Sequence, residues 1–358
     1  MTATMPITVQ FLNDSLNHRL HESWDRFVLA HPQGSPFHLL AWKRTIEETF
    51  GYQPQYVVAT EGQTVRGVLP LFLVQNLLIK RALISTPFAV YGGILADSPE
   101  AHEALHRLLP RLGAELGVQY IELRNAYPEQ CAGFEKISRY VTFTSEVGPD
   151  EAAMLAALPR KMRYMVRKAL KEDFSTRIAA DPRAFVRLYS ESLRRLGTPS
   201  FPARYFDCLL RHFEASAGAG AVAEIRETVL GGRAVAAVLS FYFRDQVLPY
   251  YGASDPEFNA KAPNNFMYYD LMRSAGVQGC RVFDFGRSKK DSGGSYDFKS
   301  HWGMAERPLP YEMLLVKRKT LPNFSPANPV FRAPRLIWQH LPGMVARMAG
   351  PALIRLVP

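Results

Sequence analysis

The sequence lacks the features that mark a secreted, membrane-spanning or zinc-binding chain. Its 358 residues include only three cysteines, Cys131, Cys208 and Cys280, which lie far apart without the spacing of metal ligands. Three cysteines cannot all pair, which fits a reducing compartment. The longest apolar stretch, residues 69–84, is interrupted by polar residues, and no basic start with an apolar run opens the chain. We therefore expect a cytoplasmic protein with no membrane span, no metal site and no tightly bound cofactor.

The composition is that of a globular protein with a strongly basic surface. Hydrophobic residues make up 47% of the chain and aromatic residues 12%, which is enough to build packed cores. The formal net charge is +10. Such a charge favours a polyanionic partner, namely RNA, a phosphate-bearing small molecule or an anionic lipid surface, and does not choose among them.

The chain repeats itself at half its length. Residues 35–50 and 198–213 each place a proline and a phenylalanine before an amphipathic helix. Residues 57–74 and 223–243 then each predict a strand, a short turn and an apolar strand. Three more pairs of landmarks follow in the same order: Tyr91-Gly92 and Tyr251-Gly252, helices near 99–116 and 264–278, and closing strands that contain Glu122 and Asp284. We therefore predict two tandem α/β (α+β) domains.

This order of elements resembles the GNAT acyltransferase fold, and two such domains in one chain resemble the FemAB family. Residues 158–172 (LPRKMRYMVRKALKE) are similar to the basic helix that opens the second domain of that family, and residues 293–303 (GGSYDFKSHWG) to its late motif. Residues 85–93 and 282–290 resemble FemAB-like proteins associated with exosortase/PEP-CTERM systems. The resemblance covers residues 7–316 and implies mixed, mostly antiparallel sheets.

The duplication and the resemblance together suggest a division of the chain. We expect a first GNAT-like domain over residues 1–150 and a second over residues 151–316, opened by the basic helix at 158–172. Residues 317–358 form a basic amphipathic tail with prolines, suited to packing on the protein or to lying on a membrane.

Two short motifs look catalytic but lack their context. Residues 284–286 read D-F-G, yet no H-R-D triplet occurs anywhere, so a kinase is excluded. His102 and His106 fit H-E-x-x-H, but Leu105 belongs to an apolar stripe that they flank and no third histidine follows. We interpret this segment as the surface of an amphipathic helix.

The basic helix is the first candidate for substrate binding. It contains six cations and no acid between residues 159 and 171, and like charges so close together favour an anionic partner over a solvated face. The candidate phosphate-binding residues are Arg160, Lys161, Arg163, Arg167 and, for stacking on a base or sugar, Tyr164.

The late motif is the candidate active site. The resemblance implies that Lys299 stabilises a developing oxyanion or the departing ribose oxygen. Asp284 is the candidate for receiving the amine proton, with Arg287 positioning it; a structural ion pair is the alternative. Trp302 is placed with the substrate-binding residues.

Tyr250 and Tyr251 end a predicted meander where GNAT strands diverge to admit the acyl group. We place Tyr251, with a strand amide beside it, among the catalytic groups and Tyr250 among the substrate-binding ones. The alternative for both is a role in the core.

The resemblance implies transfer of an aminoacyl group from aminoacyl-tRNA, or of another acyl group, to an amine of a peptidoglycan or exopolysaccharide precursor. An acyl-CoA or acyl-carrier-protein dependent N-acyltransferase is the alternative. The loop before residue 264 lacks the glycine run that holds the CoA pyrophosphate, which counts against a standard acetyl-CoA site but leaves a modified one open. A scaffold that binds RNA or the inner face of the membrane is the non-enzymatic alternative.

Overall fold

The computed structural model describes residues 5–12, 18–127, 133–218, 220–290, 294–322, 328 and 331–356. In the first half it contains β1 (Ile7–Phe11), α1 (His18–Ala30), η1 (Pro36–His38), α2 (Leu40–Phe50), β2 (Gln53–Pro54), β3 (Val57–Glu61), β4 (Thr64–Leu69), β5 (Phe72–Asn76), β6 (Lys80–Ile84), β7 (Leu95–Ala96), α3 (Pro99–Glu115), β8 (Tyr120–Leu123) and β9 (Glu135–Glu146).

The second half runs from α4 to the end of the chain. It contains α4 (Glu151–Ala157), α5 (Arg160–Ala169), β10 (Ser175–Ile178), α6 (Arg183–Leu196), α7 (Ala203–His212), η2 (Ala215–Ala217), β11 (Ala221–Leu230), β12 (Arg233–Phe243), β13 (Gln246–Ser254), η3 (Pro256–Lys261), α8 (Pro263–Val277), β14 (Val282–Asp284), β15 (Ser288–Lys289), α9 (Gly294–Ser300), β16 (Ala305–Leu315), α10 (Arg332–His340), α11 (Gly343–Leu353) and η5 (Ile354–Leu356).

Local signals set several of these boundaries. Helix α3 begins where the Ser98 hydroxyl accepts a hydrogen bond from the amide of Ala101 at 3.2 Å, with Pro99 in the first turn. Helices α2 and α6 end at Gly51 and Gly197, whose φ angles of 68° and 74° favour glycine. The repeated helix–meander–helix–strand order that the sequence predicts is therefore present in both halves.

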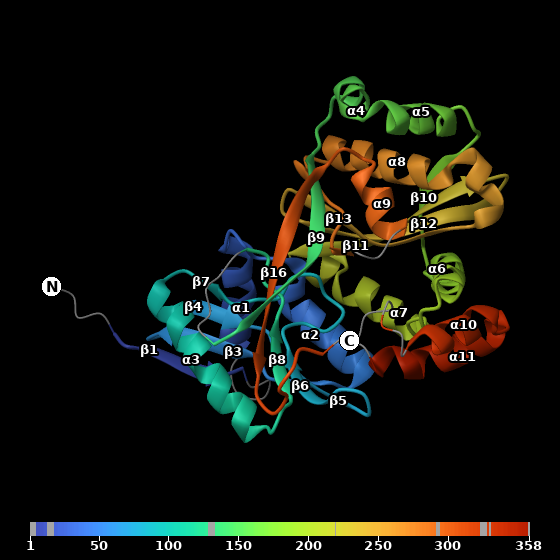
Figure 1. Ribbon diagram of the computed structural model, residues 1–358. Coiled ribbons are helices and arrows are strands. Elements are labelled where there is room, and N and C mark those ends of the chain that lie inside the picture. The colour runs from blue at the N-terminus through green and yellow to red at the C-terminus, as the bar shows by residue number, and fades with distance from the viewer. Residues whose placement is uncertain are drawn as a thin grey trace.

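Two sheets organise the molecule (Figure 1). The smaller has the order β1-β3-β4-β7, and the larger runs β10-β11-β12-β13-β14-β9-β16-β8-β6-β5-β2. Of the strand pairs described, only β13–β14 and β6–β8 are parallel. The β13–β14 pairing covers just Gln246–Val282 and Val247–Phe283, after which the two strands diverge. This divergence creates the opening at which the candidate site lies.

The two halves exchange strands. Strand β9 precedes the second half in sequence but pairs with β14, and β16 comes from the second half but pairs with β8. The two exchanged strands also pair with each other over most of their length. The larger sheet is therefore continuous across both halves.

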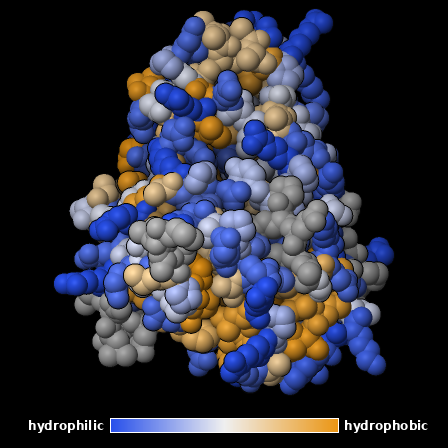
Figure 2. Space-filling model, turned by 90° about the vertical axis from the view of Figure 1, so that its left-hand side faces the viewer, coloured by the Kyte–Doolittle hydropathy of each residue, from blue (hydrophilic) through white to orange (hydrophobic). Residues whose placement is uncertain are grey.

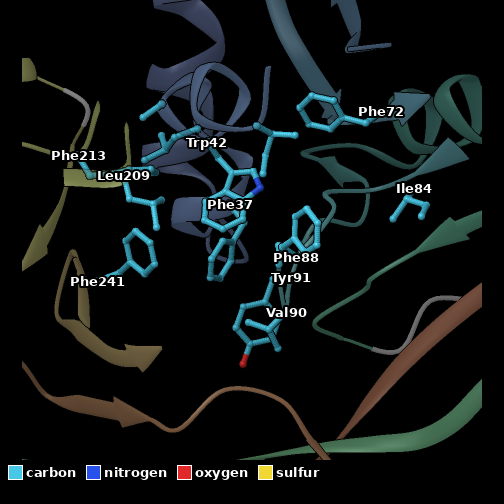
Figure 3. Close-up of a cluster of buried hydrophobic side chains, with 14 of the residues drawn as sticks. Phe37, Trp42, Phe72, Ile84, Phe88, Val90, Tyr91, Leu209, Phe213 and Phe241 are labelled. Carbon is cyan, nitrogen blue, oxygen red and sulfur yellow. The ribbon is translucent and has the colours of Figure 1, made fainter. Parts of the chain in front are cut away.

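One hydrophobic cluster also spans both halves (Figure 3). The ring of Phe37 lies 4.9 Å from that of Tyr250 and 5.6 Å from that of Phe241, measured between centroids. Trp42 packs against Phe213 at 6.5 Å. Aromatic contacts of this kind join η1 and α2 to the second half, so this cluster continues from one half into the other.

Hydrophilic and hydrophobic residues are unevenly distributed over one face of the molecule. Figure 2 shows the left-hand side of Figure 1, where hydrophilic residues cover most of the upper part and hydrophobic ones gather toward the lower end. Within the part of the chain that the structure describes, no helix is long and apolar enough to cross a membrane.

The tail forms the short helices α10, α11 and η5, of which α10 and α11 contact α6 of the second half. The indole nitrogen of Trp338 on α10 donates to the carbonyl of Thr198 at 3.0 Å, and Arg194 on α6 donates to the carbonyl of Gln339 at 2.6 Å. The tail therefore packs on the protein through one side of its helices.

Candidate active site

A cavity of about 370 Å³ opens where β13 and β14 diverge. Both halves of the chain contribute to its walls. Among the residues that line it are Phe88, Glu122, Arg124, Arg139, Tyr140, Tyr189, Tyr250, Tyr251, Phe285, Gly286, Arg287 and Lys299. We call it the central cavity. It brings together four of the predicted site residues: Tyr250, Tyr251, Arg287 and Lys299.

A bulge in β13 shapes the wall of the central cavity. The register places Ser240 opposite Pro249 and Leu239 opposite Tyr251, so Tyr250 is an extra residue in β13. A bulge of this kind leaves the extra residue outside the ladder and turns its side chain. The predicted strand amide beside Tyr251 therefore lies at an irregularity of the sheet that borders the central cavity.

The two tyrosines hold fixed positions. The hydroxyl of Tyr250 donates to the carbonyl of Phe88 at 2.6 Å, and the hydroxyls of Tyr251 and Tyr205 are 2.9 Å apart. Burial raises the pKa of Tyr251 well above its usual value, so this hydroxyl stays protonated. Both rings also pack in the shared aromatic core, so each tyrosine is a wall of the cavity and a core residue at once.

The loop of residues 85–94 forms the facing wall in a strained conformation. Thr86 and Phe88 have φ angles of 55° and 60°, which non-glycine residues seldom adopt. Arg124 holds this loop by donating to the carbonyls of Thr86 and Ala89, both at 3.0 Å. Strain kept in place by such contacts is typical of functional sites.

The central cavity has a surplus of positive charge. Four cations line it, Arg124, Arg139, Arg287 and Lys299, against the single carboxylate of Glu122. The Glu122 carboxylate accepts a hydrogen bond from Arg124 at 2.8 Å, which leaves the other three cations without a carboxylate lining the same cavity. Such a cavity is suited to an anion.

Arg287 is the most available of these cations. Its guanidinium lies over the ring of Tyr140 at 5.0 Å and that of Tyr311 at 6.0 Å, and its side chain is exposed. A guanidinium stays protonated in proteins, so Arg287 carries its charge at every working pH. Within the described residues, no carboxylate forms a salt bridge with it. Arg287 thus presents a fixed positive charge to the cavity.

Lys299 lies at the end of α9 and its side chain reaches back over the turn after β14. Its ammonium donates to the carbonyls of Phe285 at 2.6 Å and of Gly286 and Arg287 at 3.3 Å each. Burial lowers its pKa to about 8, which the nearby Asp284 partly opposes and Arg287 reinforces. Lys299 therefore joins α9 to the cavity wall as well as lining the cavity.

Asp284 lies apart from the central cavity, in a second one of about 220 Å³. Its carboxylate is buried and accepts hydrogen bonds from the Tyr91 hydroxyl at 2.5 Å, from the Gly286 amide at 2.8 Å and from the Thr142 hydroxyl. These contacts join β14 to the loop of the first half and to β9. The expected pairing of Asp284 with Arg287 is not among the ion pairs of the described residues.

The basic helix and Trp302 also lie outside the central cavity. Helix α5, near the top of Figure 1, exposes Arg160, Lys161, Tyr164 and Arg167, whereas Arg163 donates to the carbonyls of Ala156 and Leu158 at 2.7 and 2.9 Å.

Trp302 is 2% exposed and packs 5.9 Å from Phe285 in the core of the second half. It supports the wall of the central cavity from behind.

The glycine-poor loop before α8 borders a third cavity, of about 290 Å³, lined among others by Arg195, Ser254, Asn259 and Asn264. It lies at the start of α8, where the amides and the helix dipole favour an anion. Tyr268 and Phe298 form its apolar side. The third cavity and the central cavity thus both border the diverging part of β13.

Sequence reasoning missed Arg124, Arg139 and Glu122 as cavity residues. Glu122 was visible as the counterpart of Asp284, but nothing in the sequence showed that the two acids serve different cavities. Arg139 lies on β9, whose exchange between the halves has no local signal. The H-E-x-x-H residues His102 and His106 lie on α3, with ring centroids 6.4 Å apart and Leu105 buried beside them. The described residues contain no group of three potential metal ligands.

Residues 157–300 match the family model described as an acetyltransferase (GNAT) domain. Among solved structures, FemX is 16% identical, with a TM-score of 0.68 over 92% of this chain and 100% of that chain. A tandem GNAT protein from the clavulanic acid biosynthesis pathway is 12% identical, with a TM-score of 0.55 over 88% of this chain and 100% of that one. A comparison with curated protein sequences gives no match.

These comparisons show the fold of the protein. The predicted fold, two tandem GNAT-like domains with mostly antiparallel sheets, is confirmed. The matched domain and the tandem fold support an acyltransferase. GNAT acyltransferases use acyl-CoA as a substrate and not as a tightly bound cofactor.

Proposed function

We propose that this protein transfers an acyl or aminoacyl group to an amine of an acceptor that bears phosphate or another anionic group. The observation that supports this best is the central cavity, in which four cations face one carboxylate at the point where β13 and β14 diverge. The acceptor's anion would bind Arg287 and Arg139, and its amine would lie near the bulge at Tyr250.

The transfer itself needs an oxyanion site and a proton acceptor. The acceptor nitrogen attacks the acyl carbonyl, a C–N bond forms, and the bond to the donor oxygen or sulfur breaks. In our proposal the bulge amide near Tyr251 and the ammonium of Lys299 stabilise the oxyanion. The proton that the amine loses passes to Glu122, which lines the same cavity, and returns to the departing oxygen or sulfur. Asp284, in the second cavity, keeps β14 in place.

Substitution of Arg287 tests the anionic acceptor. We expect Arg287→Ala to raise the KM for the acceptor by about tenfold to hundredfold, because one charge-assisted hydrogen bond is lost. Arg287→Lys should recover part of the lost acceptor affinity, since lysine keeps the positive charge but not the planar pair of donors of the guanidinium. Steady-state kinetics with varied acceptor concentration measure the effect.

Arg233→Ala is the matched control, because Arg233 also lies over an aromatic ring, that of Phe258 at 5.5 Å, but outside the central cavity. An unchanged KM in Arg287→Ala, or an equal rise in the control, would contradict an anion-binding role for the central cavity.

The donor is either aminoacyl-tRNA, which the exposed cations of α5 favour, or acyl-CoA, which the third cavity at the start of α8 favours. We propose aminoacyl-tRNA as the first choice, because α5 and the turn after it expose five cations that have no side-chain partner among the described residues: Arg160, Lys161, Arg167, Lys168 and Lys171. Acyl-CoA is the second choice, with Arg195 and the α8 amides holding the pyrophosphate.

Neutralising α5 separates the two donors. The triple variant Arg160→Gln/Arg167→Gln/Lys171→Gln should reduce the slope of log affinity for tRNA against log salt by about three, and leave CoA binding unchanged. Arg163 stays, because it caps α4. Filter binding at several salt concentrations measures the slope.

A matched triple variant, Arg107→Gln/Arg111→Gln/Arg183→Gln, removes three exposed cations elsewhere. Equal loss of tRNA binding in both triple variants would show non-specific attraction. CoA retention without tRNA binding would establish the second choice.

A further inference from the structure

Large hydrophobic side chains that remain exposed are concentrated at one end of the molecule. Of the sixteen such side chains among the described residues, eight belong to the turn between β5 and β6 or to the helices α10 and α11. They are Leu77, Leu78, Leu336, Ile337, Met344, Val345, Met348 and Leu353. We call these residues the apolar rim. Leu77 is 97% exposed, and it lies in a group of exposed apolar side chains, which is more informative than a single one.

The two parts of the apolar rim are joined in space although they lie far apart in sequence. The side-chain amide of Asn76, just before the β5–β6 turn, donates to the carbonyl of Arg355 at 2.9 Å. The Tyr52 hydroxyl donates to the same carbonyl at 3.0 Å. Figure 1 shows the β5–β6 turn and the α10–α11 pair together at the lower right of the molecule.

The helices of the rim already pack on the protein through their buried sides, so their exposed apolar sides face solvent in the folded chain. Trp338, Ala346 and Ile354 are buried. The backbone of Gly350 approaches Ser200 so closely that a Cβ there would meet the Ser200 hydroxyl oxygen at 2.5 Å. What remains outward is the row formed by Met344, Val345 and Met348, spaced as one face of a helix.

The charged residues of the chain segment that carries α10 and α11 all have one sign, although Glu191 of the neighbouring α6 lies close to Arg347. Residues 317–358 contain seven cations and no aspartate or glutamate: Lys317, Arg318, Lys319, Arg332, Arg335, Arg347 and Arg355. Lys80 and Arg81 follow the exposed leucines of the β5–β6 turn after one buried residue, Ile79. Exposed apolar side chains with flanking cations are the combination that binds the surface of a bilayer containing anionic lipids.

We propose that the apolar rim is a docking surface for an anionic lipid bilayer, on which the protein lies without spanning it. The leucines of the turn and the apolar row of α11 enter the interface, while the flanking lysines and arginines contact lipid phosphates. A groove of about 440 Å³ between the turn and the C-terminal residues, lined by Leu73, Leu77 and Ala352, lies within this surface.

Sedimentation with vesicles tests the proposal on the full chain. Vesicles of phosphatidylcholine with phosphatidylglycerol should bind the protein at least about tenfold more tightly than phosphatidylcholine alone, and rising salt should weaken binding. The variant Leu77→Glu/Ile337→Glu/Met348→Glu should lose most of this binding. Its far-ultraviolet circular dichroism should stay unchanged, because the replaced side chains are exposed.

Val277→Glu is the control, since Val277 is 69% exposed at the end of α8, outside the apolar rim. Absence of binding to anionic vesicles would overturn the proposal, and so would an equal loss of binding in Val277→Glu. Light scattering on the wild-type chain and the triple variant tests for a dimer. If the wild-type chain is a stable dimer and the triple variant a monomer, the apolar rim is the interface with a second copy of the chain and not a membrane surface.

Discussion

Alanine in place of Lys299 is expected to lower kcat by about a hundredfold while changing the KM for the acceptor little. The expected size is that of losing one charged donor to an oxyanion in a water-poor site. Two of the three hydrogen bonds of the Lys299 ammonium are 3.3 Å long and therefore weak, so the ammonium can turn toward an oxyanion with little loss of hydrogen-bond energy. A merely structural role predicts a different result, a lower melting temperature with kcat per folded molecule unchanged.

The pH dependence gives a second, independent readout for Lys299. Burial lowers its pKa to about 8, so the ammonium predominates below that pH and the neutral amine above it. We expect kcat of the wild type to fall as pH rises through about 8, and Lys299→Ala to lack this limb. Lys290→Ala is the control, because Lys290 lies nearby but pairs with Glu306 on the surface. A wild-type profile that stays flat between pH 7 and 9 would remove Lys299 from the oxyanion site.

Replacement of Asp284 by alanine is expected to cost about 3–5 kcal/mol of unfolding free energy, the largest stability effect that we predict for a single residue. The change leaves the hydroxyls of Tyr91 and Thr142 and the amide of Gly286 buried without their acceptor. Urea unfolding followed by circular dichroism measures the loss.

Two comparisons separate this structural role from catalysis. Asp245→Ala, which removes an exposed carboxylate of the second half, should change stability by no more than about 0.5 kcal/mol. The folded fraction of Asp284→Ala, assayed at low temperature, should keep kcat within about a factor of three. A loss of kcat by a hundredfold or more with normal stability would instead make Asp284 the proton acceptor and exclude Glu122.

The sequence predicts the elements of this fold well because each has a local cause. The proline–phenylalanine starts and the apolar stripe of the helix at 99–116 act within a few residues. Because these signals occur in both halves, each predicted element is supported by its counterpart in the other half. Local causes do not specify how strands from different halves pair, and the exchange of β9 and β16 accordingly has no counterpart in the sequence pattern.

In the candidate site, too, the sequence predicts what has a local signal and not what depends on contacts between the halves. Tyr250, Tyr251, Arg287 and Lys299 were found through the duplication and the late motif, and the structure brings them to one cavity. Asp284 instead accepts a hydrogen bond from Tyr91, which is 193 residues away in sequence. The bulge at Tyr250 and the left-handed conformation of Phe88 arise from packing between the halves, which no local pattern encodes. The roles of these residues remain predictions.

The exchange of β9 and β16 has a consequence for how the molecule can move and how it can be divided. If the halves separated as rigid bodies, the ladders β14–β9 and β16–β8 would have to break, and each half would expose an unpaired strand edge of the kind that aggregates. Substrates must therefore enter the central cavity by local movement of loops, not by a hinge between the halves. For the same reason, cleavage of the chain near residue 150 would give two fragments with incomplete sheets and not two independent enzymes. The two repeated halves can therefore fold and act only together.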